Sequence, residues 1–185
     1  MVGNVFKLLI ARTDKLGDFM LTWPALADVR AALPNARIDA LVAPAVSEIA
    51  NACPYIDGVI VDSGGSSQQL RSILRTQGYD TAVALFSAAR VAHSLWGAGI
   101  RYRLGPATKV HQLFFNHRLK QRRSQSLKPE YEYNRDLIRQ LLKDHGIARP
   151  EPMPRPPFWM LAPEGLKQTA DQLAVTYGIG ERAHL

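Results

Sequence analysis

The sequence predicts an α/β protein with a Rossmann-like parallel sheet and helices on both faces. Two observations support this fold class. Short apolar, β-branched runs alternate along the 185 residues with segments of helical periodicity, which is the order of a doubly wound sheet. The run at residues 79–86 is almost continuously apolar, as in a parallel strand that is buried on both faces. In such a sheet, ligands bind at the carboxyl ends of the strands.

The alternation places the elements of the first hundred residues. We expect strands at residues 5–11, 38–43, 58–61, 79–86 and 102–104, and three short helices at residues 46–52, 68–76 and 88–96. A further apolar stripe of helical spacing follows the first strand and ends at Pro34. The start of that helix is open between Thr22, as a cap with Pro24 in the first turn, and Asp18, with a kink at Pro24.

The last third of the chain has a different composition. Residues 109–128 are basic with interleaved apolar side chains, and residues 131–145 read as an amphipathic helix that Gly146 ends. Five prolines between Pro150 and Pro157 indicate a stiff linker. We therefore expect a Rossmann-like domain at residues 1–149, a linker at 150–160, and a helix at 161–185 that leads towards a second domain.

Composition narrows the functional classes. No apolar stretch approaches the roughly 20 residues of a membrane span, and a single cysteine, Cys53, allows no internal disulfide. The five histidines lack metal-ligand spacing, so we expect no metal site. A net charge of +7 favours anionic partners such as acidic lipids, phosphorylated sugars or nucleic acid. No nucleic-acid motif frames the basic residues, so nucleic acid is not expected as a partner.

The loop after the first strand reads ARTDKLGDFM and carries acids where nucleotide binders carry glycine. Arg12, Asp14 and Lys15 occupy the places of the glycine cradle, and no P-loop is present, so this loop is not expected to hold a nucleotide. We expect Gly17 to adopt an unusual backbone conformation that presents Asp18 at the cleft, where the carboxylate could take a proton from a hydroxyl.

Two alternatives stay open at this loop. Asp18 is equally suited to cap the first turn of a helix, a common role for aspartate. Arg12 and Lys15 either bind an anionic acceptor or are lone surface cations.

This region resembles the amino-terminal start of glycosyltransferase family 9, the ADP-heptose:lipopolysaccharide heptosyltransferases. The matching elements are the Arg12-Thr13 pair, Leu16-Gly17-Asp18, Thr22 with Pro24-Ala25-Leu26, Leu33-Pro34, YDTAVAL at residues 79–85, RYRLG at 101–105 and YEYNRDLIRQLL at 131–142. The resemblance implies a GT-B fold, in which the amino-terminal domain takes the acceptor and the carboxyl-terminal domain holds the nucleotide sugar. It also implies an inverting transfer that needs no metal in the chemical step, with no cofactor, and with Asp18 as the catalytic base.

The same resemblance implies partners and a binding set. The expected partners are an ADP-sugar donor, bound by the second domain, and an anionic glycolipid acceptor, met in the cytoplasm at the surface of the inner membrane. The acceptor-binding residues are expected to be Arg12, Thr13, Lys15, Gly17, Arg101, Arg122 and Arg123. Because the sequence ends where the donor domain would begin, we expect this chain alone to be inactive.

Two other functions remain open. The basic segment could make the chain a non-catalytic module that binds an acidic glycolipid or an anionic membrane, or it could be a solvated face over ordinary core contacts. A self-sufficient Rossmann-like nucleotide binder is the second alternative.

Overall fold

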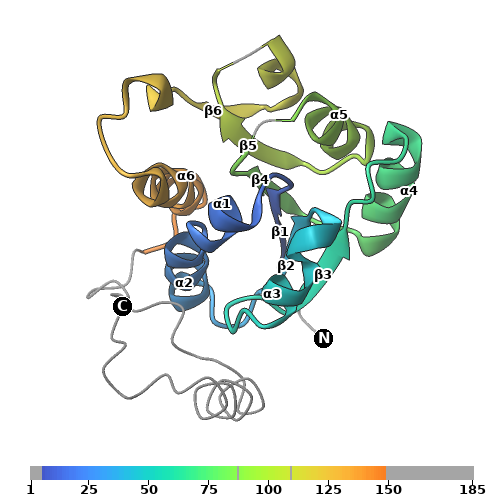
Figure 1. Ribbon diagram of the computed structural model, residues 1–185, viewed down its shortest axis with the longest axis horizontal. Coiled ribbons are helices and arrows are strands. Elements are labelled where there is room, and N and C mark those ends of the chain that lie inside the picture. The colour runs from blue at the N-terminus through green and yellow to red at the C-terminus, as the bar shows by residue number, and fades with distance from the viewer. Residues whose placement is uncertain (1–5, 87, 109, 149–185) are drawn as a thin grey trace, which may run out of the picture.

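A computed structural model describes residues 6–86, 88–108 and 110–148 (Figure 1). Within them, six parallel strands form one sheet in the order β3-β2-β1-β4-β5-β6. The strands are β1 Lys7–Arg12, β2 Arg37–Val42, β3 Gly58–Val61, β4 Thr81–Ala84, β5 Tyr102–Pro106 and β6 His117–Leu119. The predicted fold class is confirmed, and the predicted linker and carboxyl-terminal helix lie outside the described residues.

Helices connect these strands in chain order. They are α1 Leu16–Met20, α2 Trp23–Ala32, α3 Ser47–Asn51, α4 Ser67–Gln77, α5 Ala89–Gly97 and α6 Glu130–Asp144, with 3₁₀ turns η1 Pro44–Val46, η2 Val110–Phe114 and η3 Arg123–Gln125. Helix α2 starts as in the first of the two alternatives, with Thr22 at the N-cap position and Pro24 in the first turn. The Thr22 side chain makes no capping hydrogen bond, because its hydroxyl donates to the carbonyl of Phe19. The separate helix α1 and the strand β6 were not predicted.

Two apolar cores lie on opposite faces of the sheet. Successive side chains of a strand point to opposite faces, so Leu8 and Ile10 of β1 join one core while Leu9 and Ala11 join the other. Helices α1, α2, α3 and α6 cover the first face, and α4 and α5 cover the second (Figure 1). The turn from α4 into β4 needs the left-handed backbone of Gly78, whose φ is 65°.

A buried ion pair joins α2 to α6. Asp28 is fully buried, and Arg135 donates to both of its carboxylate oxygens at 2.6 and 3.0 Å. This bidentate contact fixes α6 on the sheet, because a carboxylate away from water is stable only with strong donors. The placement of α6 matters for the site, since its first turn lies at the carboxyl edge of the sheet.

We expect Arg135→Ala to lower the free energy of unfolding by about 3 kcal/mol, because it removes the bidentate cation from the buried Asp28 carboxylate. Arg139→Ala is the matched control on the same helix. Arg139 pairs with Glu132 and Asp136 of α6 itself and is partly exposed, so its loss should cost less than about 1 kcal/mol. Urea denaturation followed by circular dichroism measures both, and equal losses would contradict this account.

Candidate functional site

The candidate site lies where the strand order reverses, between β1 and β4. The crossovers from these two strands leave in opposite directions, which opens a crevice at their carboxyl ends. The loop from Arg12 to Lys15 leaves β1 there, and Leu85 and Phe86 leave β4 beside it. The amide of Leu85 donates to the carbonyl of Ala11 at 2.9 Å and holds the two strand ends together.

The guanidinium of Arg12 is the centre of this edge. Its side chain is only 3% exposed, and its Nε donates to Asp14 Oδ1 at 2.7 Å. Nη1 lies 3.2 Å from Glu130 Oε1 and 3.3 Å from Asn134 Oδ1, both on α6. Nη2 lies 3.4 Å from Asp18 Oδ1 on α1. One buried cation therefore ties the end of β1 to α1 and to the start of α6.

The network continues from α6 to the basic segment. Glu130 also accepts from Arg123 Nη1 at 2.5 Å, and Arg123 Nε donates to Gln121 Oε1 at 2.9 Å. Gln121 is buried and donates through Nε2 to the backbone carbonyl of Tyr133 at 2.7 Å. The segment that follows β6 is thus fixed to α6 by side chains that point away from solvent.

The two acids of the loop occupy different environments. The side chain of Asp14 is 14% exposed, and burial raises the pKa of its carboxyl above the ordinary 3.8, while the Arg12 guanidinium acts in the opposite direction. The side chain of Asp18 is 37% exposed and lies in the first turn of α1. Asp18 is therefore the acid of this pair that a ligand can reach.

A cavity of about 540 Å³ lies beside this network at the ends of β4, β5 and β6. Its cations are Lys120, Arg122 and Arg123, and no carboxylate of the described residues lines it. Phe86 forms part of the wall, and the Arg12 guanidinium carbon lies 5.9 Å from the centre of its ring. Asp18 is not one of the lining residues; Arg12 connects it to the cavity through Phe86. A cavity with this lining favours an anionic group.

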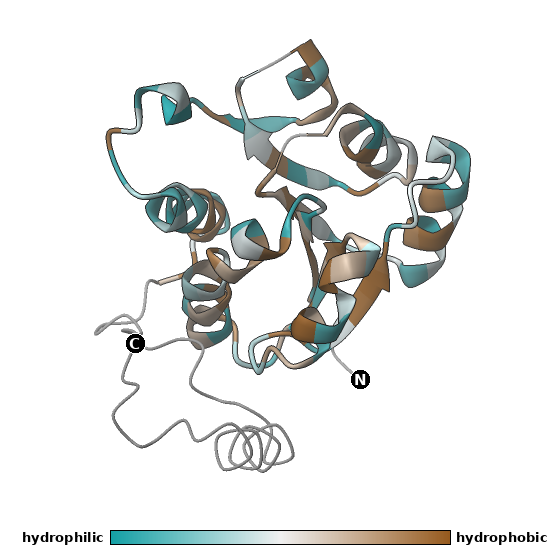
Figure 2. Ribbon diagram, viewed as in Figure 1, coloured by the Kyte–Doolittle hydropathy of each residue, from teal (hydrophilic) through white to brown (hydrophobic). Residues whose placement is uncertain are grey.

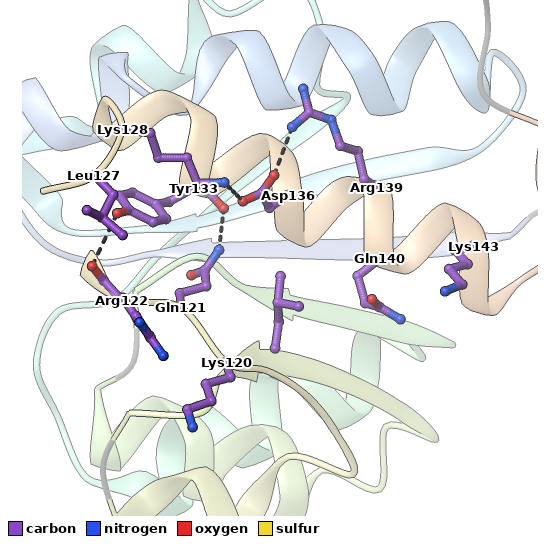
Figure 3. Close-up of a pocket in the computed structure, with 11 residues that line it drawn as sticks. Lys120, Gln121, Arg122, Leu127, Lys128, Tyr133, Asp136, Arg139, Gln140 and Lys143 are labelled. Carbon is purple, nitrogen blue, oxygen red and sulfur yellow. Dashed lines mark hydrogen bonds and ion pairs between the residues drawn. The ribbon is translucent and has the colours of Figure 1, made fainter. Parts of the chain in front are cut away.

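A second cavity of about 540 Å³ lies on the other side of residues 120–122, against α6 (Figure 3). Figure 3 shows Asp136 between Lys128 and Arg139, which both pair with it. Lys120 and Arg122 belong to both cavities. The segment that carries them therefore forms the partition between two basic cavities.

The structure brings together part of the predicted binding set. Arg122 and Arg123 line the first cavity, while Thr13, Lys15 and Gly17 lie in or next to the loop that holds Asp18. Arg101 does not join them. It directly precedes β5, so in a parallel sheet it lies at the amino edge, where it lines another depression with Arg75 and Asp80. Its expected place near the cleft is corrected accordingly.

Two other expectations about the loop also change. Arg12 is neither a lone surface cation nor open to an acceptor, because its side chain is buried among carboxylates of its own chain. The unusual backbone expected at Gly17 is wrong: Gly17 lies within α1 and is not among the described glycines with positive φ. A Cβ added at Gly17 would meet no atom within 4 Å, so the space over Gly17 is open.

The contribution of Glu130 was missed by sequence reasoning. The available signal was Asn134, a polar residue within the apolar stripe of α6, because a buried amide there implies a polar partner nearby. Glu130 precedes it by one helical turn and shares that face. In the described residues, no cluster of three or more histidine, cysteine, aspartate or glutamate side chains is suited to hold a metal ion. No helix of the described chain has the length and apolar character needed to cross a bilayer.

Comparison with known proteins supports a glycosyltransferase relationship. The chain is 43% identical over 152 residues to a Haemophilus influenzae protein named "Putative glycosyltransferase", covering 80% of this chain and 44% of that protein. No protein-family model matches the chain.

Three solved structures are similar in fold. A glycosyltransferase family 9 protein from Veillonella parvula has a TM-score of 0.73 and 17% identity, covering 98% of this chain and 52% of that one. The ADP-heptose lps heptosyltransferase II of E. coli has a TM-score of 0.70 and 21% identity, covering 92% and 51%. The E. coli heptosyltransferase WaaC with ADP-2-deoxy-2-fluoro heptose has a TM-score of 0.64 and 20% identity, covering 79% and 50%.

The chain thus spans about half the length of the proteins that it matches. The resemblance to glycosyltransferase family 9 that the sequence indicates is confirmed, in sequence by a glycosyltransferase relative and in fold by heptosyltransferases.

We expect Arg12→Gln to lower the free energy of unfolding at pH 7 by about 3 kcal/mol, because three carboxylates lose their common cation. The pKa of Asp14 should rise further, since only the effect of burial remains large. The contribution of these ion pairs is present while the carboxylates are charged and is lost as the pH falls, so the variant should differ less from wild type at pH 3.

Denaturation at both pH values and carboxyl NMR titration of Asp14 measure these effects. Lys15→Gln is the control, because Lys15 is an exposed cation of the same loop. If Lys15→Gln lowers the free energy of unfolding as much as Arg12→Gln does, the network does not depend on Arg12. An unchanged pKa of Asp14 in Arg12→Gln would show the same.

Proposed function

We propose that this chain is the acceptor-binding half of an inverting, metal-independent glycosyltransferase that transfers a heptose-like sugar from an ADP-sugar to an acidic lipopolysaccharide-core acceptor. The observation that supports the proposal is the position of Asp18: a partly exposed carboxylate at the carboxyl edge of a parallel sheet, linked through Arg12 and Phe86 to a basic cavity. The reaction class of the proposal comes from the similar proteins, and the role of each residue comes from its position in this chain.

Asp18 is the general base in this proposal. Its carboxylate takes the proton of an acceptor hydroxyl as that oxygen forms a bond to the anomeric carbon of the sugar. The bond from the anomeric carbon to the diphosphate breaks, and ADP leaves from the opposite face, which inverts the configuration. A general base of this kind contributes about 10²–10⁴-fold to the rate. The side chain of Asp18 is 37% exposed, so an acceptor hydroxyl can reach its carboxylate.

Arg12 acts through Asp18 and has no direct contact with the acceptor. Its Nε donates to Asp14, its Nη1 contacts Glu130, Asn134 and the carbonyl of Leu85, and its Nη2 lies 3.4 Å from Asp18. It thereby holds Asp18 in place and compensates the charge of its neighbours. Because Asp14 and Glu130 share the same guanidinium, Arg12 does not neutralise Asp18 alone. Arg12 faces Oδ1 of Asp18, and Oδ2, for which the described residues give no ion pair or hydrogen bond, is the oxygen that takes the hydroxyl proton.

The acceptor is held by the cations around the first cavity. Lys120 and Arg122 are exposed and form no ion pair within the described residues, so they are free to bind phosphate or carboxylate groups of the acceptor. Lys15 is exposed at the N-cap of α1 and completes the cationic rim near Asp18. The donor is bound by a second domain, since the loop after β1 carries side chains in place of a glycine cradle.

We expect Asp18→Asn to lower kcat/KM for sugar transfer by about 10²–10⁴-fold in a form of the protein that includes a donor-binding domain, because the amide cannot accept the proton. Glu48→Gln is the matched control: Glu48 is an exposed acid in the first turn of the neighbouring short helix α3. Activity of Asp18→Asn within a few-fold of wild type would rule out the base role.

We expect this chain to bind neither ADP nor NAD with micromolar affinity, because Arg12, Asp14 and Lys15 occupy the positions where a nucleotide binder has glycine. Isothermal titration calorimetry on the 185-residue chain measures this, with an established ADP-binding protein as the positive control. A micromolar dissociation constant for either nucleotide would contradict the proposal that the donor is bound by a second domain.

A further inference from the structure

Charge is distributed very unevenly along this chain. Residues 63–129 contain one acid, Asp80, and eleven basic residues. These are Arg71, Arg75, Arg90, Arg101, Arg103, Lys109, Arg118, Lys120, Arg122, Arg123 and Lys128. Helices α4 and α5, strands β5 and β6 and the turn η2 contain no acid at all. This side of the molecule therefore has a strongly positive field that its own elements do not neutralise.

Several of these cations have no carboxylate partner in the described structure. Arg118 is exposed on the edge strand β6, and Arg71 and Arg75 of α4 lie against Gly97 at the end of α5. Arg75 donates to the carbonyl of Gly97 at 2.8 Å, which leaves its positive charge uncompensated. Arg71 and Arg75 thus lie at the end of α5, and Arg118 lies on the strand that follows η2.

Three exposed apolar side chains lie where α5 meets η2. Val110 and Leu113 of η2 are 82% and 72% exposed, and Trp96 at the end of α5 is 52% exposed. Phe114 joins the two elements, with its ring centre 5.8 Å from that of Trp96. Figure 2 shows this turn at the periphery of the molecule beyond α5, with apolar residues at its outer end. We call Trp96, Val110, Leu113 and Phe114 the apolar tip.

We propose that the apolar tip inserts into an anionic lipid bilayer while the surrounding arginines bind its headgroups. Exposed aliphatic and aromatic side chains on a projecting turn suit the boundary between headgroups and acyl chains, and each nearby basic residue adds attraction to anionic lipid. The charge argues against a second copy as the occupant, because two such faces would bring arginines against arginines. The apolar tip projects from the molecule, which suits insertion into a lipid bilayer.

This surface leads directly to the candidate site. Strand β6 begins beside the apolar tip and ends at Leu119, immediately before Lys120 and Arg122 of the two basic cavities. A bilayer bound at the tip would place its headgroup region next to the cavities. That use of the surface rests on the proposed function, whereas membrane binding itself does not.

The test is cosedimentation of the 185-residue chain with vesicles of phosphatidylcholine alone or mixed with phosphatidylglycerol. We expect binding to the anionic vesicles only, weakened by salt. The double variant Val110→Ser with Leu113→Ser should lower the partition coefficient about tenfold, and Arg118→Gln about fivefold. Val61→Ser is the control, because Val61 is an exposed apolar residue of β3 at the opposite edge of the sheet. All four positions are exposed, so unchanged thermal melts should accompany each variant.

Equal binding by wild type and the double variant would overturn the proposal, as would equal binding to neutral vesicles. Light scattering without lipid gives a further outcome: a dimer that the double variant abolishes would identify a second copy as the occupant and overturn it too. Vesicle binding without sugar transfer in the two-domain form would leave this inference standing and count against the proposed function alone.

Discussion

The burial of one guanidinium among several carboxylates is the constraint on which the rest of the site depends. Arg12 ends β1 at a point where no water can neutralise its charge, so the chain must bring acids to it. Asp14 comes from the loop, Asp18 from α1 and Glu130 from α6. The same contacts give the acids of this loop a structural role: Asp14 and Asp18 compensate the charge of Arg12 where a dinucleotide binder has glycines.

That network also separates structural from reactive groups. Asp14 is largely buried and Glu130 is shared between Arg12 and Arg123, which restrains both in the interior of the edge. Asp18 has the longest ion-pair distance to Arg12 of the three acids and the greatest exposure. A carboxylate that is positioned but only weakly paired is suited to accept a proton from a substrate, and the basic cavities beside it are suited to orient an anionic one.

Much of the fold follows from the sequence because the buried strands have strong patterns. The apolar run of β4 and the alternation around β1 and β2 predict the parallel sheet, and Gly146 predicts the end of α6, where it has a φ of 63°. Strand β6 could not be predicted, since its three residues, His117 to Leu119, have no apolar pattern and become a strand only by pairing with β5. The start of β5 at Tyr102 agrees with the predicted strand, and a residue that precedes a strand of a parallel sheet lies at its amino edge, so the expected place of Arg101 near the cleft did not follow from the strand assignment. Asp18 was identified from the loop, but its link to Glu130 spans more than a hundred residues and needs the packed helix α6.

The most direct measurement of the central claim is a crystal structure of this chain with a soluble acceptor fragment, a sugar acid that carries a phosphate group. The account predicts the anionic groups of the fragment on Lys120 or Arg122 and one hydroxyl within about 2.6–3.2 Å of an Asp18 carboxylate oxygen. A fragment whose hydroxyls all lie away from Asp18, with that carboxylate facing only Arg12, would contradict it.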